Sequence, residues 1–168
     1  LTSVADKIDG NAGFCGDREP STSSSTSNGS GGTDTTGTYY GGYIRLSRNK
    51  QPTFECQNES DLYTTSGSEQ GNKVLQYPIG LITADEVAYA GGVVGSSNQS
   101  YYLYTNQYYW TMSPYNFGGT GASVSVVFDN GNFSGNSVNW TVPGVRPVIN
   151  LKADVTITGS GTTADPYR

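Results

Sequence analysis

The chain has 168 residues, a length that suits one compact domain with its own buried core. Charged residues make up 14% of it, the formal net charge is -5, and it contains no histidine. An acidic surface repels phosphate backbones and anionic lipids, which argues against nucleic acid and membrane partners. No apolar run approaches the roughly 18 residues that span a bilayer, so we expect no membrane insertion by this fragment. Because it begins at Leu1 and its single methionine is Met112, we interpret it as a processed product or a fragment.

The first candidate element is residues 1–9. Their apolar side chains have helical spacing, which predicts a short helix that ends at Gly10. Residues 20–38 are rich in Ser, Thr and Gly and have no apolar side chain to bury. This composition predicts a flexible loop. Residues 39–46 are rich in aromatic and apolar side chains and predict a strand or a short helix.

Cys15 and Cys56 lie on either side of that loop, 41 positions apart, a spacing that suits neither a metal site nor a redox pair. We interpret them as one structural disulfide; two separate buried thiols are the alternative. A disulfide requires an oxidising environment, so the expected location is extracellular, either secreted or at a cell surface. We predict no metal site and no cofactor, because a chain without histidine lacks the commonest transition-metal ligand.

Residues 80–92 predict the clearest helix. Thr83 and Glu86 have the spacing of a capping box, and Gly91 supplies a stop signal, so we assign both Thr83 and Glu86 a structural role. The neighbouring Asp85 then lies in the first turn, where the helix dipole favours a negative charge.

Strands are predicted in the last third of the chain. Residues 122–128 alternate so that one face carries Val124, Val126 and Phe128, and the following Asp-Asn-Gly at 129–131 predicts a hairpin turn. Residues 144–151 predict a further strand, which Pro147 confines to an edge, a bulge or a strand start. Helices early and an antiparallel sheet late indicate an α+β domain.

Five motifs together resemble a known family: GFCGDRE, FECQNESDLYT, GLITADEVAYAGG, YYLYTNQYYWTMSP and GVRPVINLKADVTITGSGTTADPY. The chain is similar to the C-type-lectin-like domain, related in fold to the formylglycine-generating enzyme, of surface and pilin-like proteins of Gram-positive gut bacteria. The resemblance covers most of residues 1–168 and implies one α+β domain with two helices flanking a small twisted antiparallel sheet, with long loops. It also implies that Arg146 is a structural arginine, held by carboxylates such as Asp17 or Glu19.

Enzymes related to this fold have requirements that the chain does not meet. A formylglycine-generating enzyme needs a reactive cysteine pair near its C-terminal strands, and the related iron-dependent sulfoxide synthases need histidine ligands. Both cysteines lie in the first third of the chain, histidine is absent, and no G-x-S-x-G elbow occurs. Calcium lectins of this fold carry a Glu-Pro-Asn or Gln-Pro-Asp motif, which is also missing. We therefore expect a domain without enzymatic activity.

The aromatic stretch 98–117 combines packing with recognition. We predict that Trp110 and Met112 point inward, with Trp110 structural, as the W-x-x-S-P pattern of the resemblance implies. Beyond Trp110, rings and amides fall in loops or strand ends, the composition that recognition surfaces use. The predicted ligand-binding residues are Tyr115, Asn116, Phe117, Asn132, Phe133, Asn136, Asn139 and Trp140. The alternative is that these are turn residues around a small core.

The sequence thus leads to an extracellular recognition or adhesion domain of a bacterial surface protein, whose partner is a glycan or a protein. The competing hypothesis is a structural subunit or tip of a pilin-like surface filament, whose partners are copies of itself.

Overall fold

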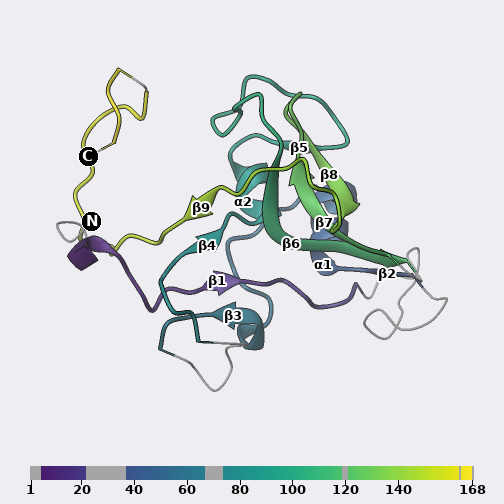
Figure 1. Cartoon of the computed structure of the whole chain (residues 1–168), viewed down its shortest axis with the longest axis horizontal. Coiled ribbons are helices and arrows are strands. Elements are labelled where there is room, and N and C mark those ends of the chain that lie inside the picture. Colours follow the sequence, from purple (N-terminus) through teal and green to yellow (C-terminus); the bar gives the residue numbers. More distant parts are fainter. Residues whose placement is uncertain (1–4, 22–36, 67–73, 119–120, 163, 168) are drawn as a thin grey trace.

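The computed structural model describes residues 5–21, 37–66, 74–118, 121–162 and 164–167. A five-stranded sheet with the order β2-β6-β7-β8-β5 dominates it (Figure 1). Its strands are β2 (Thr38–Tyr39), β5 (Val93–Val94), β6 (Tyr109–Gly118), β7 (Gly121–Val127) and β8 (Asn132–Ser137). The sheet is mixed, because β5 runs parallel to β8 while the other pairs are antiparallel.

Two small antiparallel sheets lie beside the large one, toward the two chain ends in Figure 1. One pairs β1 (Phe14–Cys15) with β3 (Leu62–Tyr63), and the other pairs β4 (Gly80–Leu81) with β9 (Pro147–Val148). The strand predicted over 144–151 therefore exists in a shorter form. Its Pro147 lies in a two-stranded sheet, where every strand has a free edge and the missing N–H is tolerated.

The helical elements are short. Helix α1 (Gly41–Tyr43) continues into the π-helical η2 (Ile44–Asn49), and α2 (Ala84–Tyr89) is a separate helix of six residues. Two single 3-10 turns, η1 (Ala5–Lys7) and η3 (Glu59–Asp61), complete the set. No helix in the described part of the chain combines the length and the apolar character needed to cross a membrane.

The capping box that begins α2 is confirmed. The Thr83 hydroxyl accepts the Glu86 backbone N–H at 3.2 Å, and the Glu86 carboxylate accepts the Thr83 N–H at 2.7 Å. The helix ends at Tyr89, and Gly91 follows with φ +106°, a conformation that glycine adopts without strain. The element is shorter than the predicted range because its first residues, Gly80 and Leu81, pair with β9 instead.

The main core lies between the sheet and these helices. Tyr109, Val127 and Phe133 are cross-strand neighbours on β6, β7 and β8, and they form one apolar row. The row packs against side chains from the helices and the loop after β5, namely Leu46, Ala84, Val87 and Tyr101. The Asp-Asn-Gly turn that joins β7 to β8 is confirmed, with Gly131 at φ +77°.

The prediction of an α+β domain with two helices flanking an antiparallel sheet is wrong. Among the described residues strand outweighs helix, 31% to 15%, and the longest helix in that part of the chain spans nine residues, 41–49. The sheet is curled and mixed rather than purely antiparallel. The helix expected over 1–9 is reduced to η1, since Ile8 already forms a β-bridge with Leu151; residues 1–4 lie outside the described chain. Most of the predicted loop 20–38 also lies outside it, but its last residue, Thr38, belongs to β2.

The prediction that Trp110 and Met112 point into the core is out of register by one residue. On β6 the buried side chains are Tyr109, Thr111 and Ser113, whereas Trp110 and Met112 are half-buried. On β7, Val127 joins the main core. Val126 is buried on the opposite face, beside its cross-strand neighbour Trp110.

The predicted disulfide is present and links β1 to the segment before η3 (Cys15–Cys56, Cα–Cα 5.5 Å). Replacing both Cys15 and Cys56 by Ser removes a cross-link over 41 positions, so we expect the free energy of unfolding to fall by about 4 kcal/mol in the chain-entropy model. Urea denaturation followed by circular dichroism measures the change. The unreduced wild type is the reference, and the double variant should not respond to a reducing agent. Equal unfolding midpoints for both proteins would contradict a stabilising role.

Candidate functional site

A cavity of about 560 Å³ opens beside the disulfide. Its wall includes β1 and Asp17, Arg45 from η2, the segment 53–59 and the first turn of α2. The remaining lining residues are Ala12, Gly13, Leu62, Leu81 and Asn150. Residues of the two small sheets, of η2 and of the start of α2 therefore meet at one place, and most of the polar side chains of the wall are charged.

Arg45 is the centre of the wall. Its guanidinium binds Asp85 through two hydrogen bonds, Nε–Oδ1 at 3.1 Å and Nη2–Oδ2 at 2.8 Å. Nη2 also donates to Oδ2 of Asp17 at 2.6 Å. Both carboxylates are about 5% exposed and the arginine side chain 18% exposed, so this network is largely removed from water.

The chain conformation brings these three charges together. Arg45 is the second residue of η2, and Asp85 occupies the first turn of α2. Asp17 has φ 48°, an uncommon conformation for a residue with a side chain. Gly42 lies against it, because a Cβ at Gly42 would come within 2.7 Å of Oδ2 of Asp17. The absence of a side chain at Gly42 therefore leaves room for the Asp17 carboxylate.

The pKa values of this network reflect two opposing effects. Burial raises the pKa of Asp17, and the hydrogen bond from Arg45 offsets only part of that rise. Burial would lower the pKa of Arg45, but its hydrogen bonds to Asp85 and Asp17 outweigh this and raise its pKa above the ordinary value. Arg45 thus remains a permanent cation in the cavity wall.

The segment 53–59 forms the outer wall, and three contacts hold it. The Thr53 N–H donates to Oδ1 of Asp85 at 2.9 Å, and Cys56 is joined to β1 through the disulfide. The ring of Phe54 stacks on Tyr89 of α2 with centroids 3.9 Å apart and an interplanar angle of 9°. The Tyr89 hydroxyl donates to the Pro52 carbonyl at 2.9 Å, which fixes the pair from its other side.

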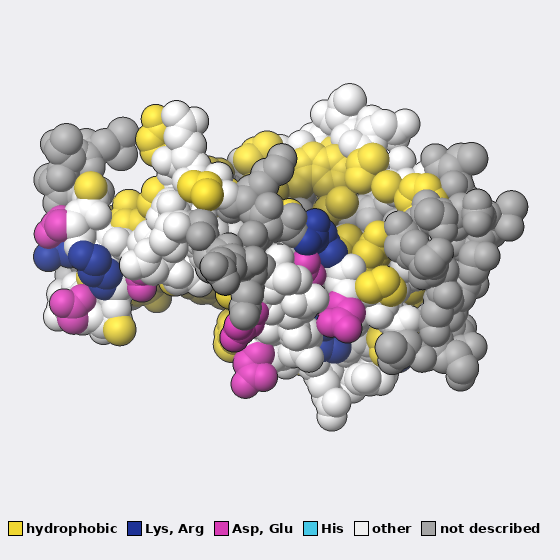
Figure 2. All heavy atoms as spheres, turned by 90° about the horizontal axis from the view of Figure 1, so that it is seen from below, with side chains coloured by type: hydrophobic (Ala, Val, Ile, Leu, Met, Phe, Trp, Pro, Cys, Tyr) yellow, Lys and Arg dark blue, Asp and Glu magenta, His cyan; other side chains and the backbone are white. Residues whose placement is uncertain are grey.

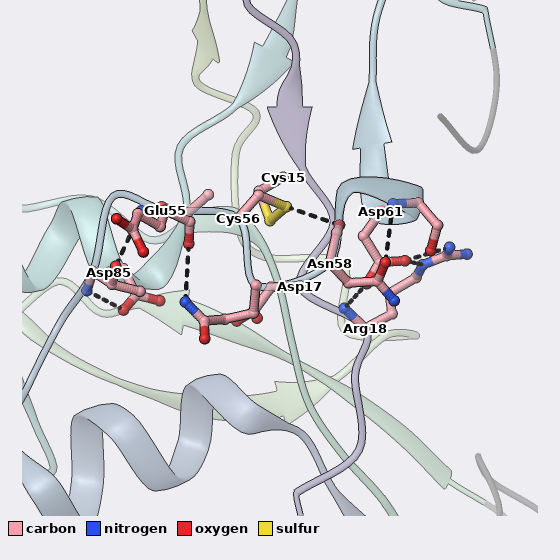
Figure 3. The surroundings of a disulfide bond; sticks show 12 residues. Cys15, Asp17, Arg18, Glu55, Cys56, Asn58, Asp61 and Asp85 are labelled. Carbon is pink, nitrogen blue, oxygen red and sulfur yellow. Dashed lines mark hydrogen bonds and ion pairs between the residues drawn. A yellow bond between two sulfur atoms is a disulfide. The ribbon is translucent and has the colours of Figure 1, made fainter. Parts of the chain in front are cut away.

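This aromatic pair lies at the rim of the cavity in an exposed position. Phe54 lines the cavity and is 71% exposed, and Tyr89 is 50% exposed. Figure 3 shows Glu55 and Asp85 on one side of the disulfide and the Arg18–Asp61 ion pair on the other. On the face seen in Figure 2, acidic and basic side chains lie close together in the middle of the molecule.

The predicted ligand-binding residues do not form one surface. Phe133 is in the main core at 2% exposure. Tyr115 packs its ring against Tyr39 and Tyr43, and it belongs to the half-buried part of β6. The other members at that end of the sheet are Asn116, Phe117 and Asn136, which lie in paired strands and are half-buried.

The remaining three predicted residues lie elsewhere. Asn132 begins β8, where its backbone N–H bonds to the side chain of Asn130. Asn139 is exposed in the turn after β8, and Trp140 packs in a three-ring cluster with Tyr108 and Phe128. None of the eight residues lines the cavity described above.

The predicted partners of Arg146 are wrong. Its guanidinium donates to the Leu103 carbonyl at 3.1 Å and lies 4.5 Å from the ring centroid of Tyr109. Arg146 therefore supports the core through a cation–π contact, as a structural residue, while Asp17 is bound by Arg45 instead. The carbonyl of Glu19 accepts the Gly41 N–H, so this residue contributes its backbone to the start of the helix.

Sequence reasoning missed Arg45, Phe54 and Tyr89. A signal for Arg45 exists in YYGGYIRL, where one charge interrupts an apolar and aromatic segment that must be buried somewhere. Phe54 and Tyr89 are 35 positions apart, and nothing in their local sequence indicates that they meet. Among the described residues, no group of three or more Cys, Asp or Glu side chains is arranged to hold a metal ion.

We expect Arg45→Met to lower the free energy of unfolding by roughly 3–5 kcal/mol, because it leaves Asp17 and Asp85 buried without a cation. The exposed Arg48 on the same helix is a matched control, and Arg48→Met should have little effect. Urea denaturation measures both.

The triple variant Asp17→Asn, Arg45→Met, Asp85→Asn should recover much of the stability, since no uncompensated charge then remains. If the single variant is as stable as the wild type, the network does not carry the stability that its burial implies.

No family model, no curated protein and no solved structure matches this chain. What the cavity binds must therefore be argued from its own residues: a rigid arginine–carboxylate wall, an outer segment held by a disulfide, and a stacked aromatic pair at the rim.

Proposed function

We propose that the chain is an extracellular recognition domain without enzymatic activity, and that it binds a glycan at this cavity. One observation carries the proposal: the stacked Phe54–Tyr89 pair is exposed at the rim of a polar cavity. An exposed apolar ring costs free energy in water, and a cavity that adjoins one offers a ligand both a flat apolar face and hydrogen-bonding groups.

A sugar ring has the same two properties. Its axial C–H groups form an apolar face that packs on an aromatic ring, and its hydroxyls need hydrogen-bond partners around the edge. Here Tyr89 covers one face of Phe54, and the exposure of Phe54 leaves contact area for a ligand. Thr53, Glu55 and Asn150 are polar residues of the same wall.

Support for binding rather than catalysis comes from the charged groups. The two buried carboxylates, Asp17 and Asp85, are committed to Arg45, and the chain contains no histidine that would transfer protons near neutral pH. The disulfide supports an oxidising location, as found outside cells.

Phe54→Ala should weaken glycan binding by at least about tenfold, because it removes the stacking platform. Its fold should be intact, since the side chain is 71% exposed. A glycan array identifies the ligand, and isothermal titration calorimetry compares the variants. Tyr102→Ala is the control: Tyr102 is 64% exposed but does not line the cavity. Equal affinities for wild type and Phe54→Ala would refute this site.

A second function, a structural subunit of a surface filament that packs against its own copies, has one observation in its favour. Residues 138–157 expose a series of apolar side chains: Val138, Val142, Val145, Ile149, Leu151 and Ile157. Exposed apolar side chains that gather on one segment can form a surface for protein–protein contact.

If that segment packs against other copies, the wild type should self-associate at high concentration in analytical ultracentrifugation. The variant Val145→Ser, Ile149→Ser, Leu151→Ser should remain monomeric with an unchanged circular dichroism spectrum, because all three side chains are at least 43% exposed. A wild type that stays monomeric at every concentration tested would argue against the filament.

A further inference from the structure

The cavity has a strong excess of negative charge. Its lining includes the carboxylates of Asp17, Glu55, Glu59, Asp85 and Glu86 but a single basic residue, Arg45. With all of them ionised, five negative charges and one positive charge leave a net charge of -4. The whole chain carries -5, so nearly all of its net charge corresponds to this one site.

Three of these carboxylates are not neutralised by the protein. The ion pairs among the described residues involve Asp17 and Asp85 at this site, but not Glu55, Glu59 or Glu86. One oxygen of Glu86 caps α2 by accepting from the N–H and hydroxyl of Thr83. Glu55 and Glu59 are exposed on the outer wall, and neither carboxylate forms an ion pair with another described residue.

The cavity and the aromatic pair, independently of this charge, indicate a ligand larger than an ion. A volume of about 560 Å³ exceeds what a metal ion needs. The acidic side chains in the described part of the chain are also not grouped closely enough to chelate one. The exposed Phe54–Tyr89 stack provides an apolar face for a ring. The site therefore suits an organic molecule that combines a ring with a positive charge.

We infer that the ligand of this cavity is an amino sugar, a glycan whose free amine is protonated and lies against the carboxylates of the outer wall. This rests on the proposed glycan-binding function. The ring packs on Phe54, and the ammonium group donates charge-assisted hydrogen bonds to the carboxylates of the outer wall, Glu55 and Glu59. An anionic sugar is repelled by the same charges, and a neutral one gains nothing from them.

The test compares two probes of the same length and backbone: a short oligosaccharide of glucosamine units, whose amines are charged, and its fully N-acetylated counterpart, which is neutral. Isothermal titration calorimetry at about pH 6, where the amine is protonated, should give at least about tenfold tighter binding of the amino form. Glu55→Gln with Glu59→Gln should abolish that preference, while Asp154→Asn, an exposed acidic residue outside the cavity, should preserve it. Both variants should unfold at the wild-type temperature.

The other results separate the two proposals. If both oligosaccharides bind with equal affinity, the site takes glycans but the amino-sugar assignment is overturned. If neither binds and the glycan array is also blank, the glycan-binding function itself is overturned. If Nα-acetyl-lysine amide, whose side-chain amine is protonated, binds the wild type more tightly than the amino sugar, the ligand is the lysine side chain of a protein, and the sugar assignment is overturned.

Discussion

The buried contact between Arg45 and the carboxylates of Asp17 and Asp85 is the interaction on which the rest of the arrangement depends. It joins three parts of the chain that no long element connects: the residues after β1, the nine-residue helix 41–49, and the first turn of α2. Three buried charges are tolerated because each has a partner, and Thr53 satisfies a further lone pair of Asp85. The cost of breaking the set once it is buried keeps the three parts in place.

Covalent and aromatic contacts extend this centre outward. The disulfide attaches Cys56 to β1, and the segment that it holds carries Phe54 and Glu55. Tyr89 reaches the same segment from α2 through its ring and its hydroxyl. The buried apolar set of the described residues is small, and a cross-link and an ion network add stability where packed side chains are few. Because the core is small, the cavity wall is held by the disulfide, the ion network and the stacked aromatic pair at its rim.

The five-stranded sheet stabilises the opposite side of the molecule. Its apolar row of Tyr109, Val127 and Phe133 packs against α2 and the 41–49 helix. In addition, the hydroxyl of Ser113 on β6 accepts a hydrogen bond from the backbone N–H of Ala84 at 2.9 Å. The sheet thus orients α2, and α2 in turn presents Asp85 and Tyr89. Arg146, through its contact with Tyr109, contributes to that support rather than to the cavity.

Local chemistry alone determined several features of this protein. The Thr83–Glu86 capping box, the glycine stop after α2, the turn at 129–131 and the single disulfide all follow from residues that are close in sequence or from a count of cysteines. Only the tertiary structure decided which residues of β6 and β7 face the main core, because both faces of these strands carry apolar residues and a period of two fits either register. It also decided that Phe133 belongs to the core, that Asp17 binds Arg45 rather than Arg146, and that Phe54 meets Tyr89. These contacts join residues far apart in the chain, and their partners are selected by the packing of whole elements, on which a local pattern carries no information.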